Sequence, residues 1–164
     1  PLQLAVMSAR LATGKNLMPR LLLTKDKVNP KSLGFAQDHI DLVRLAMRNV
    51  VYGGGTAGRA RLPLPDIQIA GKTGTADKPR RGGGYYDDKV INTFASVFPA
   101  EEPKYVLIVT LDEPVDRTGP EVRRTAGWTA VPVAAEIVRR TAPLLGMRPA
   151  IAPQPLDGLT AVKQ

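Results

Sequence analysis

The chain has 164 residues, enough for one domain with its own hydrophobic core. Hydrophobic residues make up 43% and charged residues 23%, and no stretch approaches the ~18 consecutive apolar residues of a membrane helix. The sequence contains no cysteine, which excludes disulfides and thiolate metal sites. The net charge of +8 raises the question of nucleic-acid binding. We expect none, because no basic run is interleaved with the few aromatic residues.

The first predicted element is a helix at the start of the chain. Leu4, Met7 and Leu11 recur at helical spacing, and Gly14 stands where a C-cap is expected. The polar segment 24–34 then predicts a loop.

A second helix is predicted from Asp38, as its N-cap, to about Tyr52. The triplet Gly53-Gly54-Gly55 would end it. The apolar stripe of this helix is expected to comprise Ile40, Val43, Met47, Val50 and Val51.

Three strands are predicted in the middle of the chain. Ile67, Ile69 and residues 71–75 indicate the first, and residues 91–98 the second. The third, 105–111, is a continuous apolar run, which predicts a central strand buried on both faces. The short link 99–104 predicts an antiparallel hairpin. The charged, glycine-rich residues 77–89 predict a mobile loop.

A last helix is predicted from Trp128 to Leu145, with Pro132 tolerated in its first turn. Its buried face should carry Val131, Ala135, Val138, Ala142 and Leu145. The domain is predicted to cover 1–147, followed by a loosely held Pro-rich tail at 148–164. The fold class is α+β, a three-stranded antiparallel meander with helices packed on it.

Two glycine motifs are excluded by their context. Gly53-Gly54-Gly55-Thr56-Ala57-Gly58 matches G-x-G-x-x-G, but a dinucleotide site needs that motif between a strand and a helix. Here it follows a helix and is interpreted as a plain loop. Gly71-Lys72-Thr73 resembles the end of a P-loop, but Asp66 stands where the first glycine is required.

The segment Ala-Gly-Lys-Thr-Gly-Thr-Ala at 70–76 suits recognition of a carboxylate beside an extended backbone. Lys72 supplies charge, while Thr73 and Thr75 supply hydroxyls. Gly74 lets a ligand backbone approach, and an extended ligand could then pair with the strand. The same residues also suit a solvated edge strand whose lysine discourages pairing. On these residues alone, both interpretations stay open.

The surrounding sequence resembles class B penicillin-binding proteins, whose third motif is Lys-Thr-Gly. The similar segments are Gly54-Gly55-Thr56-Ala57, residues 94–100, Asp112-Glu113-Pro114, Gly127 and Ala130-Val131-Pro132. The pattern covers about 1–147 and is most similar to the septal, cell-division transpeptidases. It implies the C-terminal part of the serine β-lactamase/penicillin-binding-protein transpeptidase-like fold. Trp128 stands where that family usually has a smaller residue.

The family's nucleophile motif is absent from this sequence. Ser8, Ser32 and Ser96 begin neither Ser-x-x-Lys nor Ser-x-Asn. We therefore expect a longer parent protein that carries both motifs upstream, and no acylation of this chain alone.

The resemblance implies a peptidoglycan D,D-transpeptidase that cross-links stem peptides through a serine acyl-enzyme and is trapped by β-lactams. Lys72 would contribute charge and help proton transfer, and Thr73 and Thr75 would hold the terminal carboxylate. Gly74 would leave room for the substrate, and the Thr75 N–H would complete the oxyanion hole. In this scheme the catalytic residues within the chain are Lys72 and Thr75.

The resemblance implies no metal or organic cofactor. It places the parent in the inner membrane with a periplasmic catalytic domain, and division-machinery proteins among its partners. The family's sheet has more strands than the three predicted here, so an uncovered edge and self-association of the chain are also expected.

Two alternative functions stay open. One is a serine β-lactamase or D,D-carboxypeptidase, against which the hairpin and closing-helix pattern argues. The other is a non-catalytic module that binds cell-wall polymer or protein partners. His39 is interpreted as a structural or surface residue, and Asp87-Asp88 as solvated charge rather than a metal pair.

Overall fold

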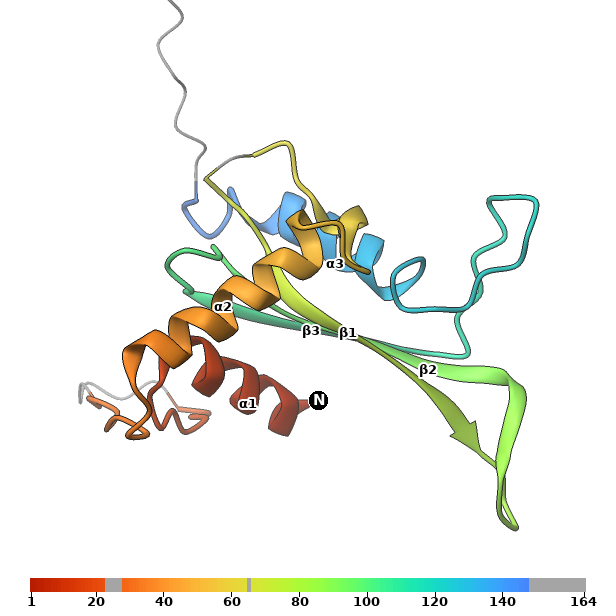
Figure 1. Cartoon of the computed structure of the whole chain (residues 1–164), viewed down its shortest axis with the longest axis horizontal. Helices are drawn as coiled ribbons and strands as arrows, with labels where there is room; N and C mark the ends of the chain where they lie inside the picture. Colours follow the sequence, from red (N-terminus) through yellow and green to blue (C-terminus); the bar gives the residue numbers. More distant parts are fainter. Residues whose placement is uncertain (23–27, 65, 148–164) are drawn as a thin grey trace, which may run out of the picture.

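The structure is a computed structural model that describes residues 1–22, 28–64 and 66–147 (Figure 1). The elements within these ranges, in chain order, are α1 (Leu2–Thr13), α2 (Gln37–Tyr52), the 3-10 turn η1 (Gly58–Ala60), β1 (Ala70–Pro79), β2 (Tyr85–Phe98), β3 (Tyr105–Asp112) and α3 (Ala130–Thr141). The strands form one antiparallel sheet in the order β1-β2-β3. The predicted α+β class and three-stranded meander are therefore confirmed.

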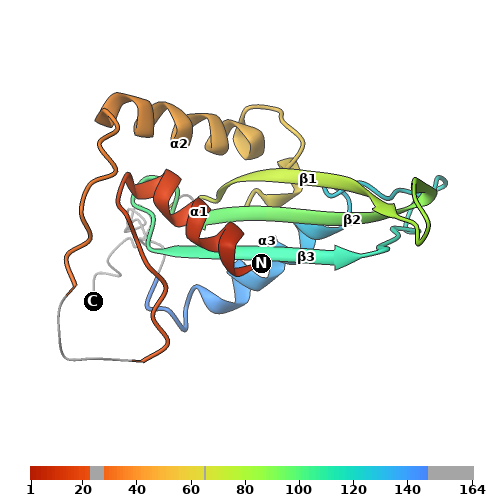
Figure 2. The same cartoon turned by 90° about the horizontal axis from the view of Figure 1, so that it is seen from below.

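The sheet lies between α1 on one face and α3 on the other, and α2 lies beside β1 (Figure 2). On the α3 face, Phe94, Phe98 and Val109 are buried with Val131 and Val138 of the helix. On the α1 face a smaller buried cluster contains Ala12, Ala70, Val97 and Ala100. Because side chains alternate along a strand, each strand residue belongs to one face or the other.

The first two helices were predicted at nearly the right positions. Gly14 caps α1 with φ 65°, and its N–H donates to the Arg10 carbonyl. The predicted N-cap of α2 was wrong, because Ala36 is the cap and makes no side-chain hydrogen bond. Asp38 instead lies in the first turn, where a negative charge favours the positive end of the helix dipole.

The predicted loop at 77–89 was wrong, because β1 and β2 continue through it as a hairpin extending beyond the helices (Figure 1). The turn is confined to the glycine-rich segment 80–84, where the Arg80 N–H donates to the Gly84 carbonyl. Gly82, Gly83 and Gly84 all have positive φ, which suits a tight turn. Few apolar side chains are buried there, so the hydrophobic pattern did not indicate strands.

β3 was predicted to be central, but it lies at one edge of the described sheet and β2 is the central strand. Its apolar run reflects contacts with a helix on each face: Val106 joins the α1-side cluster, and Val109 the α3-side core. β3 therefore lies at the edge of the sheet and is still covered by a helix on each face.

The closing helix is shorter than predicted. Trp128 and Thr129 lie in the turn before it, and Leu145 is 38% exposed in the turns after Thr141. Within the described ranges, no helix has the length and apolarity needed to cross a bilayer. The predicted tail at 148–164 lies outside the described residues.

Candidate functional site

A cleft of about 500 Å³ opens beside β1 on the α3 side of the sheet. Its walls come from the loop after α2, from β1 and from the segment that enters α3. The lining residues are Thr56, Gly58, Arg59, Thr73, Thr75, Thr125, Ala126, Gly127 and Trp128. Segments more than fifty residues apart in sequence therefore form one site.

Thr73 and Thr75 face this cleft from β1. The Oγ1 atoms of Thr73 and Thr56 are 2.7 Å apart, and the Ala126 N–H donates to the Thr75 Oγ1 at 3.1 Å. A threonine hydroxyl has one donor and two acceptor sites. Because Thr75 accepts from Ala126, its hydroxyl hydrogen remains available to a ligand oxygen.

Gly127 allows the two loop walls to approach each other. A Cβ at this position would lie 2.4 Å from the Thr56 carbonyl oxygen, closer than real Cβ atoms come to backbone. Gly71 has a similar role beneath the site, since a Cβ there would lie 2.7 Å from the Phe94 ring. The cleft therefore depends on glycine at both positions.

Asn92 fixes the wall formed by residues 124–129. Its side chain is completely buried, and its Nδ2 donates to the Arg124 carbonyl at 2.5 Å and to the Thr129 Oγ1 at 2.6 Å. The Thr129 hydroxyl in turn donates to the Thr125 carbonyl. This central-strand amide thus holds the segment that carries Ala126 and Trp128.

Lys72 does not line the cleft. It pairs with Ala95 in the next strand and lies between Ala70 and Gly74, so alternation places it on the α1 face. Its ammonium donates to the Thr73 carbonyl at 2.8 Å, and its side chain is exposed. The structure therefore brings Thr73 and Thr75 together and directs Lys72 to the opposite side of the same strand.

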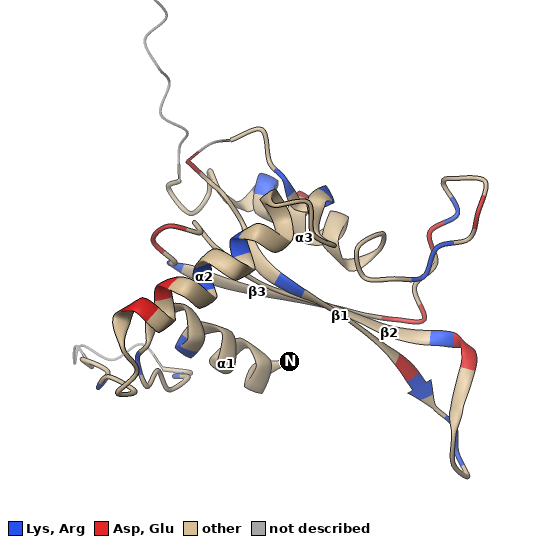
Figure 3. Ribbon diagram, viewed as in Figure 1, with Lys and Arg blue, Asp and Glu red and all other residues tan. Residues whose placement is uncertain are grey.

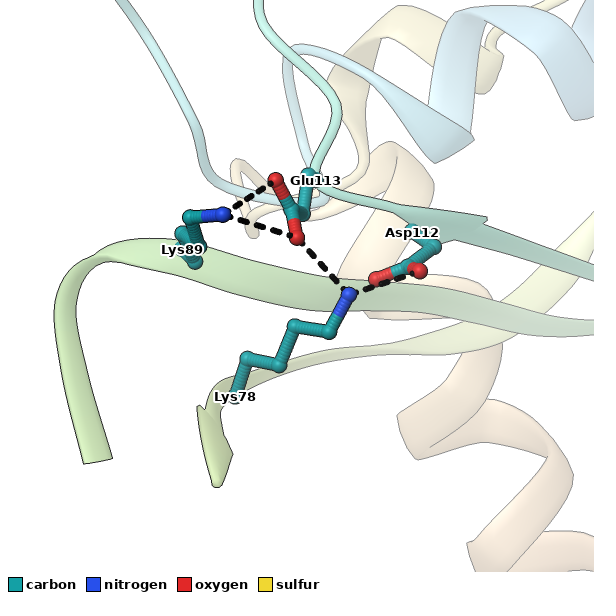
Figure 4. A network of polar contacts seen from close by, with 4 residues as sticks. All are labelled: Lys78, Lys89, Asp112 and Glu113. Carbon is teal, nitrogen blue, oxygen red and sulfur yellow. Dashed lines mark hydrogen bonds and ion pairs between the residues drawn. The ribbon is translucent and has the colours of Figure 1, made fainter. Parts of the chain in front are cut away.

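An ion-pair network joins β1, β2 and the end of β3 (Figure 4). The Lys78 Nζ lies 2.9 Å from an Asp112 carboxylate oxygen and 2.7 Å from one of Glu113, which also contacts Lys89. The hydrogen bond from Lys78, followed by that from Lys89, holds the pKa of Glu113 below its usual value. The bonds to Glu113 and Asp112 raise the pKa of Lys78. The network lies at the point where the loop 113–124 leaves the sheet.

The other polar candidates lie away from the cleft. His39 is exposed on the first turn of α2, and Asp87 forms an ion pair with Arg80 in the hairpin. Among the described residues, no group of three or more His, Asp or Glu side chains is arranged to hold a metal ion. Lys and Arg are interspersed with Asp and Glu over helices, hairpin and loops rather than gathered on one face (Figure 3).

Sequence reasoning missed Thr56, Thr125 and Trp128 as site residues. Thr56 and Gly127 were both noted in family-like segments, but nothing in their spacing indicated that they meet. Their proximity comes from tertiary packing of the loop after α2 against the entry to α3.

Comparison with known proteins assigns the family. Residues 1–139 match the penicillin binding protein transpeptidase domain. The chain belongs to this family. A probable peptidoglycan D,D-transpeptidase FtsI from Caulobacter vibrioides is 32% identical over 161 residues, which cover 90% of this chain and 26% of that protein.

Solved structures of the family share the fold. The transpeptidase domain of penicillin-binding protein 3 from Burkholderia pseudomallei superimposes with a TM-score of 0.74 at 29% identity, covering 92% of this chain and 44% of that one. Penicillin-binding protein 3 from Mycobacterium tuberculosis, in complex with ampicillin, gives 0.59 at 28% identity over 80% of this chain and 29% of that one. The chain thus spans about a quarter to under a half of these relatives.

Proposed function

We propose that this chain is the Lys-Thr-Gly part of a peptidoglycan D,D-transpeptidase of the cell-division type. The observation that carries the proposal is the pair of threonine hydroxyls, Thr73 and Thr75, on a strand beside an open cleft. They belong to a Lys-Thr-Gly-Thr segment inside the region that matches the transpeptidase family. The naming of the Caulobacter relative as a D,D-transpeptidase favours this activity over that of a β-lactamase or carboxypeptidase.

In the proposed reaction, a serine outside this chain attacks the penultimate D-alanine carbonyl of a stem peptide. The serine oxygen forms an ester, the peptide bond breaks, and the serine's proton passes to the departing D-alanine. An amine of a second stem peptide then attacks the ester, forms the cross-link and returns the proton to the serine. β-Lactams would acylate the same serine, as the ampicillin complex of a relative suggests.

Thr73 and Thr75 bind the terminal carboxylate of the donor peptide in this scheme. Their hydroxyls lie on the same face of β1 and can donate to one carboxylate. Hydrogen bonds to a charged acceptor are about twice as strong as those between neutral groups. Gly74, between them, leaves the strand accessible to the ligand backbone; a Cβ there would meet only a Thr93 carbonyl oxygen at 3.8 Å.

The backbone N–H of Thr75 completes the oxyanion hole. β1 is an outer strand of the described sheet, so alternate residues direct their N–H and C=O groups away from β2. The Lys72 ammonium contacts the Thr73 carbonyl, which indicates that Thr73 and, two residues later, Thr75 point outward. One such donor contributes about 10²–10³ in rate.

Lys72 supplies positive charge and assists proton transfer from the α1 face of the strand. The nucleophilic serine and its lysine belong on that side in this proposal, because the Lys72 ammonium is exposed and free to be reoriented toward them.

The proposal places the parent enzyme in the inner membrane, its catalytic domain in the periplasm, and division-machinery proteins among its partners. It needs no metal or organic cofactor.

The test uses the transpeptidase that contains this chain and its Ser-x-x-Lys segment. Thr73→Val and Thr75→Val should each slow acylation by benzylpenicillin roughly tenfold or more, since each removes a hydrogen bond to a charged group. Thr93→Val is the matched control, because Thr93 pairs with Thr110 away from the cleft. Equal acylation rates in all three variants would contradict the proposed carboxylate site.

Self-association of the chain is also part of this proposal. Large apolar side chains are exposed on α1 and α2, including Leu2 at 64%, Met7 at 48%, Leu42 at 64% and Leu45 at 50%. Sedimentation of the 164-residue chain should show dimers or larger species at micromolar concentration, and Leu42→Gln with Leu45→Gln should reduce them. A strictly monomeric wild-type chain would contradict it.

A further inference from the structure

Trp128 is held between two arginines at the edge of the cleft. The guanidinium carbon of Arg59 lies 3.8 Å from the Trp128 ring centroid, and that of Arg123 lies 3.6 Å from it. Two guanidinium groups at these distances cannot share one face of a ring without overlapping. They therefore stack on opposite faces, an arrangement that cation–π attraction favours.

The three residues of this stack come from separate segments that are each fixed in place. Arg59 belongs to η1, and Trp128 lies in the wall that Asn92 holds. Arg123 lies in the loop 113–124, where its backbone N–H and C=O both bond to Asp116. The stack is therefore prepared by the fold before any ligand arrives.

The donor groups of the stack are unused. Within the described residues, neither the Arg59 nor the Arg123 guanidinium has a hydrogen-bond or ion-pair partner. In the part of the chain that the structure describes, the acidic group that interacts electrostatically with both arginines is Asp116. Its carboxylate accepts two hydrogen bonds from Thr118, which are the main cause of its lowered pKa, and the two arginines lower that pKa further. Two positive charges and one negative charge leave the stack with a net positive charge.

The stack adjoins the threonine cleft. Arg59 and Trp128 line the same cavity as Thr73 and Thr75. An arginine stacked on an aromatic ring still presents its planar N–H fork at the ring's edge, where it fits a carboxylate. We propose that the Arg59–Trp128–Arg123 stack is a specificity subsite for a second carboxylate on the ligand, beyond the carboxylate held by Thr73 and Thr75.

This inference rests on the proposed function, because it requires a peptide or β-lactam in the cleft. The ligand class is a dicarboxylate: a donor peptide with an acidic side group, or a penicillin with an acidic side chain. In this proposal Arg59 and Arg123 bind the second carboxylate and take no part in the acylation step. Their loss should therefore affect ligands with the second carboxylate selectively.

The test compares benzylpenicillin with its α-carboxy derivative, carbenicillin, which adds one carboxylate to the same scaffold. Second-order acylation rates are measured for the transpeptidase that contains this chain. Arg59→Gln and Arg123→Gln should each slow acylation by carbenicillin roughly tenfold, the loss expected for one charge-assisted hydrogen bond, and leave benzylpenicillin within about twofold. Arg117→Gln is the control, because it removes the same charge from an exposed position in the same loop.

A second measurement does not depend on the variants folding. In the wild-type enzyme, the ratio of the carbenicillin rate to the benzylpenicillin rate should fall as salt is raised, because the second carboxylate meets charge in an open cleft. The same variants are also assayed with two donor peptides, one with a side-chain carboxylate and one with a carboxamide in its place. This comparison identifies whether a peptide or a β-lactam supplies the second carboxylate.

The outcomes separate the two proposals. If neither penicillin acylates the wild-type enzyme, the proposed function fails. If both acylate it, while the arginine variants change the two rates equally or not at all and salt leaves their ratio constant, the subsite is refuted and the function stands. A selective loss for the dicarboxylate of either pair supports the subsite.

Discussion

The two faces of the sheet differ in how completely the chain itself packs them. The α3 face buries large side chains such as Phe94, Phe98 and Val131. The α1 face buries a much smaller cluster around Ala12 and Val97, and leaves Leu2 and Met7 of α1 exposed. The threonine cleft lies on the well-packed side, and Lys72 lies on the other.

This difference in packing distinguishes a part of the candidate site that the chain itself preorganises from a part that it does not. Thr73 and Thr75 have partners from the loop after α2 and from the entry to α3, so the side of the cleft that we propose for the carboxylate is preorganised. Among the described residues, the Lys72 ammonium is hydrogen-bonded to its own strand, at the Thr73 carbonyl. Under the proposed function, binding on the α3 face should depend on this chain, whereas acylation on the α1 face should depend on the serine and lysine expected in the parent protein.

The largest expected effect is the complete absence of acylation when the 164-residue chain is tested by itself. The 164-residue chain by itself should form no covalent adduct with a fluorescent penicillin, because none of its serines begins a Ser-x-x-Lys motif. Intact mass spectrometry after incubation is the measurement, with the Burkholderia relative's transpeptidase domain as positive control. A stable adduct on this chain would mean that the nucleophile lies within it and that the α1 face is already complete.

The next effect concerns Lys72 in the enzyme that carries the nucleophile. Lys72→Ala should slow acylation by β-lactams by roughly one to two orders of magnitude, through loss of a charge-assisted interaction. Its effect on unfolding should be small, since the side chain is exposed. Arg81→Ala, at the exposed hairpin turn, is the matched control. If both variants acylate at the wild-type rate, Lys72 only guards an edge strand.

The sequence predicts that Lys78 lies in a mobile loop, within residues 77–89. That prediction was wrong, because Lys78 lies on β1 and pairs with Asp112 and Glu113. The hairpin is held by its ladder and by contacts such as Arg80 and Lys89 around the Tyr86 ring, not by apolar burial. Because such strands bury few apolar side chains, the hydrophobic pattern of the sequence does not indicate them.

The Lys-Thr-Gly strand was predicted from local residues, because the chemistry and the strand lie in one short segment. The cleft as a whole was not, since Thr56 lies 17 residues from Thr73 and meets it only through packing. The sequence analysis grouped Lys72 with Thr73 and Thr75, whereas alternation along β1 places Lys72 on the opposite face from the threonine cleft. Trp128 was noted only as unusual in size, because Arg59 comes from a distant segment and Arg123 reaches the ring only through the path of the loop 113–124.

A moderate effect on stability is expected from Gly127→Ala. The new Cβ would lie 2.4 Å from the Thr56 carbonyl oxygen, so the loop after α2 must move away from the cleft wall. Overpacking of this kind costs roughly 1–3 kcal/mol in the free energy of unfolding, measurable by urea denaturation of the chain. Gly58→Ala is the control in the opposite wall of the same cleft, because a Cβ there meets nothing within 4 Å. Equal stability of the two variants would show that the walls do not depend on this close approach.

The smallest effect is expected from the exposed ion-pair network of Lys78, Asp112 and Glu113 (Figure 4). The folded-state pKa of Glu113 lies below its usual value of 4.5, so its contribution to stability is present above that value and is lost as pH falls through the folded pKa. Lys78 has a raised pKa, so its contribution is present below 10.5 and is lost at higher pH.

Lys78→Met should therefore lower the melting temperature slightly at pH 7, by less than Gly127→Ala does, because exposed pairs contribute little. The difference between Lys78→Met and wild type should shrink as the pH falls below 4.5 and Glu113 takes up a proton at its lowered pKa. Arg81→Met, which removes a charge outside the network, should show no such convergence. A melting-temperature difference for Lys78→Met that is constant from pH 7 to pH 3 would mean that Lys78 acts through the packing of its side chain on β1, and that the ion pairs contribute nothing to holding the hairpin against β3.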